Sequence, residues 1–317
     1  MNILLLSIYD NGQQMQLLAE AFRKYTNHDA IHVAMASSYL NYDADYTLSK
    51  LQTPQEMLQL ETLMHEHTDF FILSEGLPDF SKLTPTLNKL KLRPLMNKTN
   101  TIVRTGGSAP SRYPELYLMA WLQRQWVYTG AYHDWHIATN IGYVAPTRNI
   151  CPIDKIGDYY PPDDKIRICF APTKSVKGVP EFNTALTILE SKYDNVEVTP
   201  IINMSWAEAI RAKRNCNITI DTLTGIPGYG NTSIESMFLR HAVLSKLDEY
   251  TKMLYPDIPI YDVKDTPETV SALSALIENK DLLISAGELG NKFVLKYHHP
   301  EIVVEMWEHL INHVTSQ

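Results

Sequence analysis

The stretch Ile218–Ser245, ITIDTLTGIPGYGNTSIESMFLRHAVLS, decides the fold of this chain. A short β-rich run, Ile218–Asp221, leads into a glycine-punctuated loop and a helical segment, and Ala242–Leu244 is a second candidate strand. Glycines let a backbone approach a ligand closely, and a helix N-terminus offers unpaired N–H groups and a positive dipole end. The stretch therefore predicts an α/β unit whose loop binds a phosphate. A tight strand-to-helix connection without a ligand is the alternative.

The loop in this stretch carries glycines followed by residues of the helix N-cap type. The glycine spacing matches neither the dinucleotide fingerprint nor the P-loop, so it does not name a particular nucleotide fold. Glu235, which the sequence places in the first helical turn, is expected to accept hydrogen bonds from two neighbouring ribose hydroxyls. The candidate ligand-binding residues of the stretch are Gly228, Tyr229, Gly230, Asn231, Thr232, Ser233 and Glu235.

The chain has 317 residues, a length that is enough for two domains. Its 44% hydrophobic and 20% charged residues are typical of a globular protein. No apolar run of about 18 residues is present, so we expect no membrane span. The segment Met1–Ser7 resembles a first strand more than a signal peptide. Three scattered cysteines, without metal or disulfide spacing, are typical of a reducing compartment. We therefore expect a cytoplasmic protein, in the host cytoplasm if the chain is encoded by a phage.

Charge is distributed unevenly along the chain. Residues 1–150 hold 12 Lys/Arg and 13 Asp/Glu, so most of the net charge of −8 lies in the remainder. Between Lys82 and Arg112 the charged residues are all basic. This basic run is either a solvated helix face with its loop or a surface for a polyanionic partner.

Alternating strand and helix patterns predict a parallel α/β architecture in two domains. We expect one domain in residues 1–150, a second in residues 165–297, and a C-terminal helix in residues 298–317 that packs back on the first domain. The run Pro146–Asp164, rich in proline, is expected to be the linker. The expected strands include Ile3–Ile8, Ala30–Ala36, Phe70–Ser74, Thr101–Arg104, Trp126–Thr129, Ile141–Val144, Ile166–Phe170 and Val196–Ile201. The expected helices include Met15–Tyr25, Pro54–His65, Lys82–Leu90, Pro114–Gln123, Glu181–Tyr193, Trp206–Lys213, Pro267–Glu278, Lys280–Tyr297 and Glu301–Val314.

Open α/β sheets bind ligands beyond the carboxyl ends of their strands, which singles out four strand ends. Lys174 and Lys177 follow the strand at Ile166 and suit a diphosphate, although a pair of surface lysines is the plain alternative. In the first domain the candidates are Asp10, Asn11 and Gly12 after the first strand, Glu75 and Gly76 after the third, and Arg104, Gly106, Gly107 and Ser108 after the fourth.

Three pieces of the second half resemble the donor domain of GT-B glycosyltransferases of the family 4/family 1 group. The segment Ile168–Gly178 resembles the strand that leads to two basic residues, and Asn215–Asp221 resembles the strand before the donor loop. The run Gly228–Met237 resembles the signature that ends in Glu-Ala-Met. The family often has a second acid eight residues before the ribose glutamate, and here Pro227 stands at that place. The resemblance covers residues 165–250, and its departure at Pro227 leaves the sugar undefined.

This resemblance implies two Rossmann-like domains that face a central cleft and a reaction that transfers a sugar from a nucleoside diphosphate, most often UDP. Lys174 and Lys177 would hold the diphosphate beside Thr173, and Glu235 would bind the ribose. The family usually retains anomeric configuration and needs no metal or other cofactor. Asp43 and Asp45 have the spacing of a metal motif but lie in an early loop. The acceptor hydroxyl would then be placed by the first domain, with Asp10 among the catalytic candidates.

The segment His133–His136 is a further candidate, because histidine titrates near neutral pH. His133 is expected either to contact sugar or act as a base, or to belong to a strand-edge loop with Trp135 in the core. As a zinc site the pair of histidines lacks further ligands.

Three functions remain open from the sequence: a sugar transferase, a GT-B-like nucleotide-sugar epimerase, and a catalytically silent module that only binds the nucleotide sugar. The basic run favours a polyanionic acceptor, such as hydroxymethylated phage DNA or a cell-surface polymer, whereas the acidic whole chain argues against DNA. A neutral glycan, a lipid-linked sugar or a protein is the alternative acceptor.

Overall fold

The computed structural model describes residues 1–37, 40–74, 100–105, 127–130, 145–160, 165–171, 179–223 and 228–316. Two compact units make up the chain. Unit 1 consists of Met1–Ile150 with Pro300–Gln317, and unit 2 consists of Cys151–His299. The expected helices at 82–90 and 114–123 and the expected strand at 141–144 lie outside the described residues.

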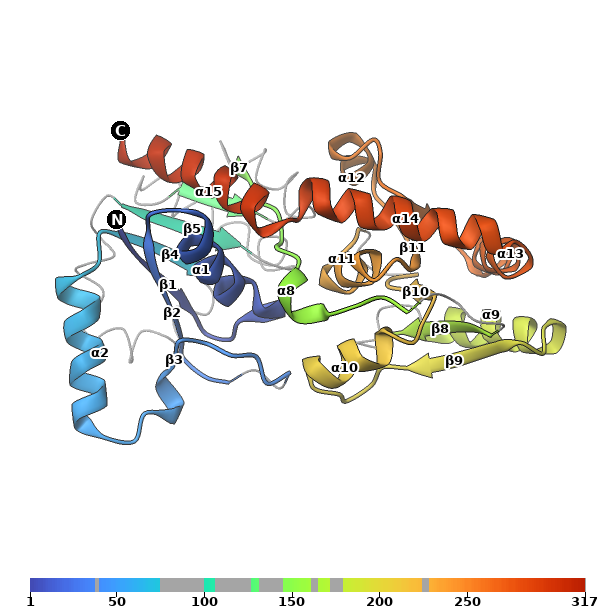
Figure 1. The fold of residues 1–317 in the computed structure, drawn as a ribbon, viewed down its shortest axis with the longest axis horizontal. Coiled ribbons are helices and arrows are strands. Elements are labelled where there is room, and N and C mark those ends of the chain that lie inside the picture. The colour runs from blue at the N-terminus through green and yellow to red at the C-terminus, as the bar shows by residue number, and fades with distance from the viewer. Residues whose placement is uncertain are drawn as a thin grey trace. The chain divides into compact units, whose positions relative to one another are not determined.

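Unit 1 is built on a parallel sheet with strand order β3-β2-β1-β4-β5-β6-β7 in the described residues (Figure 1). β1 occupies the middle of this sheet because it pairs with both β2 and β4, with Leu5 opposite His32 and Ile72. Its apolar residues are buried on both sides, which is typical of a parallel strand covered by helices. The strands are β1 (Asn2–Ser7), β2 (Asp29–Ala34), β3 (Tyr46–Thr47), β4 (Phe70–Ser74), β5 (Thr101–Thr105), β6 (Val127–Gly130) and β7 (Ala145–Pro146).

One face of the unit 1 sheet is covered by α1 (Gln14–Tyr25) and by the C-terminal helix α15 (Pro300–Thr315). Ile3 and Leu5 of β1 share a core with Phe22 of α1 and with Trp307 of α15, which is 1% exposed. The strict alternation of strand side chains sends these residues to one face and Leu4 to the other. The remaining described helical elements of this unit are η1 (Asn11–Gln13), η2 (Leu48–Lys50) and α2 (Pro54–Glu66).

Unit 2 has a second parallel sheet, with strand order β12-β11-β10-β8-β9 in the described residues. Its strands are β8 (Ile166–Phe170), β9 (Val196–Pro200), β10 (Ile218–Ile220), β11 (Ala242–Ser245) and β12 (Ile260–Asp262). Its helices are α8 (Ile153–Ile156), α9 (Val179–Lys192), α10 (Trp206–Lys213), α11 (Asn231–Phe238), α12 (Glu249–Leu254), α13 (Thr266–Glu278) and α14 (Lys280–Tyr297).

Alternating residues of β11 enter two different cores of unit 2. Ala242 and Leu244 pack with residues of α9 and α13, whereas Val243 packs with residues of α10 and α11. Both faces of the sheet are therefore covered by helices, and the parallel α/β architecture expected from the sequence is confirmed in both units.

The boundary between the two units, after Ile150, lies inside the segment expected as the linker, Pro146–Asp164, and the part from Cys151 onward belongs to unit 2. Cys151 and Ile156 are fully buried in the unit 2 core, and Ile156 is the last residue of the short helix α8. The Cys151 N–H donates to the carbonyl of His298 at 2.8 Å. The proline-rich sequence did not predict this structure. The chain here is ordered by burial and by a backbone contact with a distant segment, and not by local propensity. The sequence also missed α12, β12 and β3.

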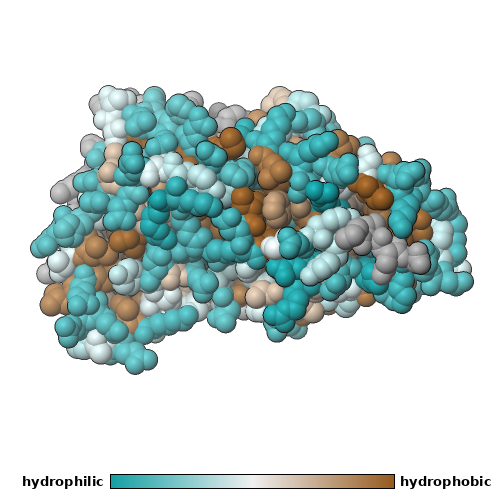
Figure 2. Space-filling model, in the orientation of Figure 1, coloured by the Kyte–Doolittle hydropathy of each residue, from teal (hydrophilic) through white to brown (hydrophobic). Residues whose placement is uncertain are grey.

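Figure 2 shows a face of the molecule on which hydrophilic residues predominate and apolar ones form smaller areas. None of the helices in the described ranges combines the length and the apolar character that crossing a bilayer requires.

Candidate functional site

The central stretch of unit 2 forms a loop and helix at the carboxyl end of the sheet. Gly228 has a φ of 133°, which only glycine adopts readily. Its N–H donates to the carbonyl of Lys246 at 2.7 Å, and its carbonyl accepts the Ser245 hydroxyl at 2.8 Å. The loop is therefore fixed to the end of β11, where open α/β sheets place their ligands.

Asp221, which follows β10, stabilises the start of α11. Its Oδ2 accepts the Ser233 hydroxyl at 2.7 Å and the Gly230 N–H at 3.4 Å. The helix begins at Asn231 with Gly230 at the N-cap, and no side chain of the N-cap residue itself contributes. The expectation of an N-cap among Asn231, Thr232 and Ser233 is thus wrong, because the helix already begins at Asn231 and the N-cap position falls on Gly230.

Tyr229 has its side chain in the core of unit 2, with 1% of its surface exposed. Its hydroxyl lies 3.0 Å from Nε2 of His298, and its ring makes edge contacts with Tyr255 and Phe293. A ligand at the loop would therefore meet the backbone of Tyr229 and not its ring. Asn231 and Thr232 are half-buried at the start of α11.

Glu235 lies one turn into α11, since no acidic residue occupies the first turn. Its Oε2 is 2.6 Å from Nζ of Lys213, and its Oε1 accepts the Trp206 indole N–H at 2.8 Å. Burial lowers the pKa of Lys213, but the charge and hydrogen bond of Glu235 outweigh that effect, so the pKa is raised. Both partners come from α10, and the sequence offered no signal for either. The role of Glu235 toward ribose stays a prediction.

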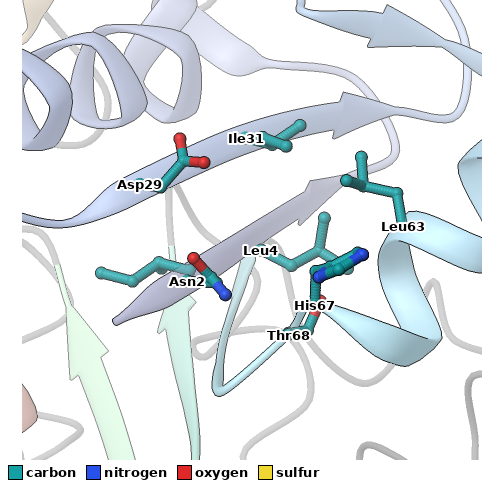
Figure 3. A pocket seen from close by; sticks show the side chains of 8 residues that line it. Asn2, Leu4, Asp29, Ile31, Leu63, His67 and Thr68 are labelled. Atoms are coloured by element: carbon teal, nitrogen blue, oxygen red, sulfur yellow. The ribbon is translucent and has the colours of Figure 1, made fainter.

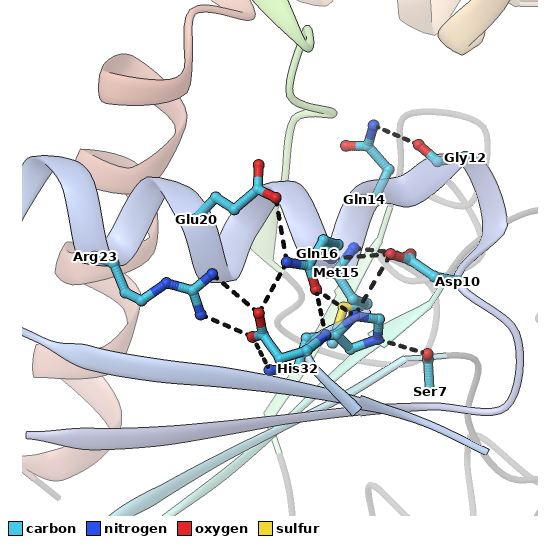
Figure 4. A network of polar contacts seen from close by, with 10 residues as sticks. Ser7, Asp10, Gly12, Gln14, Met15, Gln16, Glu20, Arg23 and His32 are labelled. Atoms are coloured by element: carbon cyan, nitrogen blue, oxygen red, sulfur yellow. Dashed lines mark hydrogen bonds and ion pairs between the residues drawn. The ribbon is translucent and has the colours of Figure 1, made fainter. Parts of the chain in front are cut away.

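Asp10, at the end of β1, caps α1. Its two oxygens accept the N–H groups of Met15 and Gln16, each at 2.9 Å, and its side chain is 3% exposed (Figure 4). A contact of Asp10 with an acceptor stays a prediction, and its carboxylate has a structural function as the cap of α1. Asn11 and Gly12 continue the loop as the helical turn η1, in which Gly12 has a φ of 69°.

A buried histidine lies beside this cap in Figure 4. The amide of Gln16 donates to carboxylates, so its Oε1 faces Nδ1 of His32 at 3.1 Å. Nδ1 therefore carries the proton, and Nε2 accepts the Ser7 hydroxyl at 2.9 Å. Burial lowers the pKa of His32 to about 4, so the ring is neutral at physiological pH.

Asp45 belongs to the same network. It accepts hydrogen bonds from Arg23 at 2.8 Å and from the His32 N–H at 2.9 Å. Although its partial burial raises its pKa, these hydrogen bonds lower it by more. Asp45 therefore acts as a structural ion-pair partner in an early loop.

Gln13 is a residue that the sequence analysis missed. It is 3% exposed and has a left-handed φ of 61°, and its Oε1 lacks a hydrogen-bond partner within the described part of the chain. Strained residues gather at functional sites, and buried polar atoms are usually satisfied. A glutamine after Gly12 carries no sequence signal, so only the backbone conformation reveals this candidate.

Arg104 is buried at the carboxyl end of β5, and its Nη2 donates to Oδ1 of Asn149 at 2.6 Å. It thus lies at the same sheet edge as Ser74 of β4, its register partner. The candidates outside the described residues are Thr173, Lys174, Lys177, Gly106, Gly107, Ser108, His133, Glu75, Gly76 and Pro227.

A hollow of about 120 Å³ lies at the opposite edge of the unit 1 sheet, at the amino ends of β1 and β2. Figure 3 shows Asn2 and Asp29 from these strands, with His67 and Thr68 after α2. The amino edge is not where parallel sheets bind substrates, so we assign this hollow no function. Within the described ranges, no three His, Cys, Asp or Glu side chains gather in a way that could hold a metal ion.

Comparisons with known proteins find similar structures but no matching sequence family. No protein-family model and no curated protein sequence matches this chain. A glycosyltransferase from Rickettsia africae has a similar structure, with a TM-score of 0.65 at 10% identity, covering 99% of this chain and 98% of the other. Sucrose-phosphate synthase from Thermosynechococcus elongatus has a TM-score of 0.64 at 11% identity, covering 100% and 99%.

An epimerase is also among the similar structures. UDP-GlcNAc 2-epimerase from Neisseria meningitidis, bound to UDP-GlcNAc, has a TM-score of 0.52 at 12% identity, covering 98% of this chain and 100% of the other. Because such likenesses span both units at low identity, they define the fold and leave the reaction open. The chain has the GT-B fold, with two Rossmann-like α/β units.

Proposed function

We propose that this chain is a glycosyltransferase that moves a sugar from a nucleoside diphosphate, UDP above all, to an acceptor hydroxyl. One observation carries the proposal. A buried carboxylate, Glu235, follows the glycine loop Gly228–Gly230 at the carboxyl edge of the unit 2 sheet, in a chain with the GT-B fold over its full length. An ionised carboxylate only accepts hydrogen bonds, as two ribose hydroxyls require.

The diphosphate would be met by Lys174 and Lys177, with Thr173 beside them and the backbone N–H groups at the start of α11. Leaving-group charge develops on the diphosphate as the sugar bond breaks, and fixed positive groups stabilise that charge. We propose that the reaction retains anomeric configuration and needs neither a metal nor an enzymic nucleophile. The reaction would take place in the cytoplasm.

Unit 1 would hold the acceptor. The proposed contacts lie around Asn11, Gly12 and Gln13 after β1 and around Arg104 after β5, with Gly106, Gly107, Ser108 and His133 as further candidates. The helix amides that Asp10 occupies are closed to an anion, so the β1 edge suits a neutral hydroxyl group. A polyanionic acceptor, such as hydroxymethylated DNA or a cell-surface polymer, would use the basic residues between Lys82 and Arg112.

A screen of nucleoside diphosphates and their sugars by thermal shift, followed by product analysis, tests this proposal. We expect a nucleotide sugar to raise the melting temperature, the free diphosphate to appear on incubation, and an added acceptor to increase its release. Substitution of Lys174 and Lys177 by Ala should weaken diphosphate binding. If no nucleotide sugar binds, the proposal is wrong.

The second candidate is a nucleotide-sugar epimerase, which the likeness to the Neisseria enzyme favours. Incubation with UDP-GlcNAc and no acceptor distinguishes the two enzymes. An epimerase changes the configuration of the sugar without an acceptor, whereas a transferase needs an acceptor for efficient transfer. A silent binding module would return every nucleotide sugar unchanged.

A further inference from the structure

Glu235 and Lys213 form an ion pair that is almost inaccessible to solvent, with 9% and 3% of their side chains exposed. Such a pair is seldom the most stable choice for a core, because desolvation of two charges offsets their attraction. A pair of apolar side chains of similar volume would serve stability as well. The presence of this pair inside the candidate site therefore invites a functional explanation.

The geometry of the carboxylate supplies one. Oε2 accepts from Nζ of Lys213 at 2.6 Å, and Oε1 accepts from the indole of Trp206 at 2.8 Å. Each oxygen has about two lone-pair sites, so about one site per oxygen remains. Two parallel acceptors on one rigid group match the two hydroxyls of a ribose.

Holding the carboxylate from both sides also fixes its orientation. A free glutamate side chain rotates about three bonds, and binding would have to order it. Here α10 provides both donors, Trp206 at its first position and Lys213 at its last, two turns apart on one helix face. The charge and hydrogen bond of Glu235 raise the pKa of Lys213, so the lysine keeps its positive charge at neutral pH.

We propose that Lys213 and Trp206 are positioning residues that hold the Glu235 carboxylate in the orientation that accepts a vicinal diol, and that their loss weakens the preference of the site for a ribonucleoside diphosphate over its deoxy counterpart. The inference rests on the proposed function and adds two positioning residues to it. A site of this kind rejects a ligand that lacks one hydroxyl because a carboxylate lone pair is then left unpaired.

The test measures dissociation constants of the full chain for ADP, CDP, GDP and UDP, each against its 2′-deoxy form, by isothermal titration calorimetry. We expect the preferred diphosphate to bind about tenfold or more tightly than its 2′-deoxy form. Trp206→Phe, which keeps the ring but loses the N–H, should reduce this ratio by about threefold or more. Lys213→Met should reduce it further.

Ser205→Ala is the matched control. Ser205 caps α10 by accepting the Glu208 N–H, whereas the hydrogen bonds to Glu235 come from Trp206 and Lys213. This variant should lower the melting temperature and leave the discrimination ratio unchanged. If Lys213→Met does not fold, Trp206→Phe decides the matter alone, because loss of one indole hydrogen bond leaves the ion pair intact.

The outcomes separate the two proposals. Failure of every diphosphate to bind overturns the proposed function and this inference with it. Equal binding of the ribo and deoxy forms, or a full ratio in folded Trp206→Phe, overturns the inference alone. A ratio that falls in Trp206→Phe but not in Ser205→Ala supports it.

Discussion

Two buried carboxylates, Asp10 in unit 1 and Glu235 in unit 2, lie at sheet edges of the same kind but are held in different ways. Backbone N–H groups of α1 hold Asp10, and its neighbour His32 is neutral. Side chains of α10, one of them charged, hold Glu235. A carboxylate that binds helix amides defines the local backbone, whereas one held by another helix depends on tertiary packing and keeps acceptor sites for a ligand.

Lys213→Met, which removes the ion pair with Glu235 in unit 2, should have the largest effect on the free energy of unfolding. It leaves the carboxylate of Glu235 buried without a counter-charge, which costs about 3–5 kcal/mol of unfolding free energy. The double variant Lys213→Met with Glu235→Met should recover most of that loss, because neither charge remains. Urea unfolding followed by circular dichroism measures both, and a cost below about 1 kcal/mol for the single variant would refute the argument.

Acid should weaken unit 1 through His32. The folded-state pKa of about 4 lies below the ordinary value of 6.5, so only the unfolded chain binds a proton between these values. Stability is therefore unaffected by this group above pH 6.5 and falls as pH drops toward 4, by about 2 kcal/mol between pH 7 and pH 5.

Unfolding midpoints at pH 7 and pH 5 check this prediction, with His32→Asn as the comparison. The variant should show a shallower pH dependence, part of which remains because burial also lowers the pKa of His28. An equal slope in both proteins would show that His32 does not carry the effect.

Asp10→Ala should have a moderate effect. It removes the acceptor for the Met15 and Gln16 N–H groups and should cost about 1–2 kcal/mol, as loss of a helix cap does. Faster hydrogen exchange at the first turn of α1 would locate the loss. Asp29→Ala, an exposed residue at the start of β2, should stay within about 0.5 kcal/mol of the parent. Equal effects of the two substitutions would contradict the capping role.

Gln13→Gly should have the smallest effect and the opposite sign. It relieves the left-handed backbone at φ 61°, for a net gain of about 1 kcal/mol after the entropic cost of glycine. If Gln13 contacts the acceptor, the variant should also raise the KM for acceptor and leave donor binding unchanged. Asn203→Gly, at an exposed left-handed residue with φ 55°, is the control and should change neither the KM for acceptor nor donor binding.

Local pattern predicted much of the architecture. Phe70–Ser74, Ile166–Phe170, Trp206–Lys213 and Lys280–Tyr297 have the expected bounds, because apolar periodicity and helix-capping residues are properties of neighbouring positions. Weak elements such as β3 and β12 escaped notice because their short runs depend on a neighbouring strand for their hydrogen bonds. The burial of Cys151 and Ile156 in a proline-rich segment was hidden for the same reason.

The sequence by itself determined that the chain forms two parallel α/β units, and it located the loop Gly228–Gly230 and the glutamate after it, since glycines and an acidic residue can be read at fixed spacing. Only the tertiary structure decided what surrounds that glutamate. Lys213 and Trp206 lie 22 and 29 residues away in the chain. Their approach depends on the core that residues of α10 and α11 share, and no local pattern encodes membership of that core.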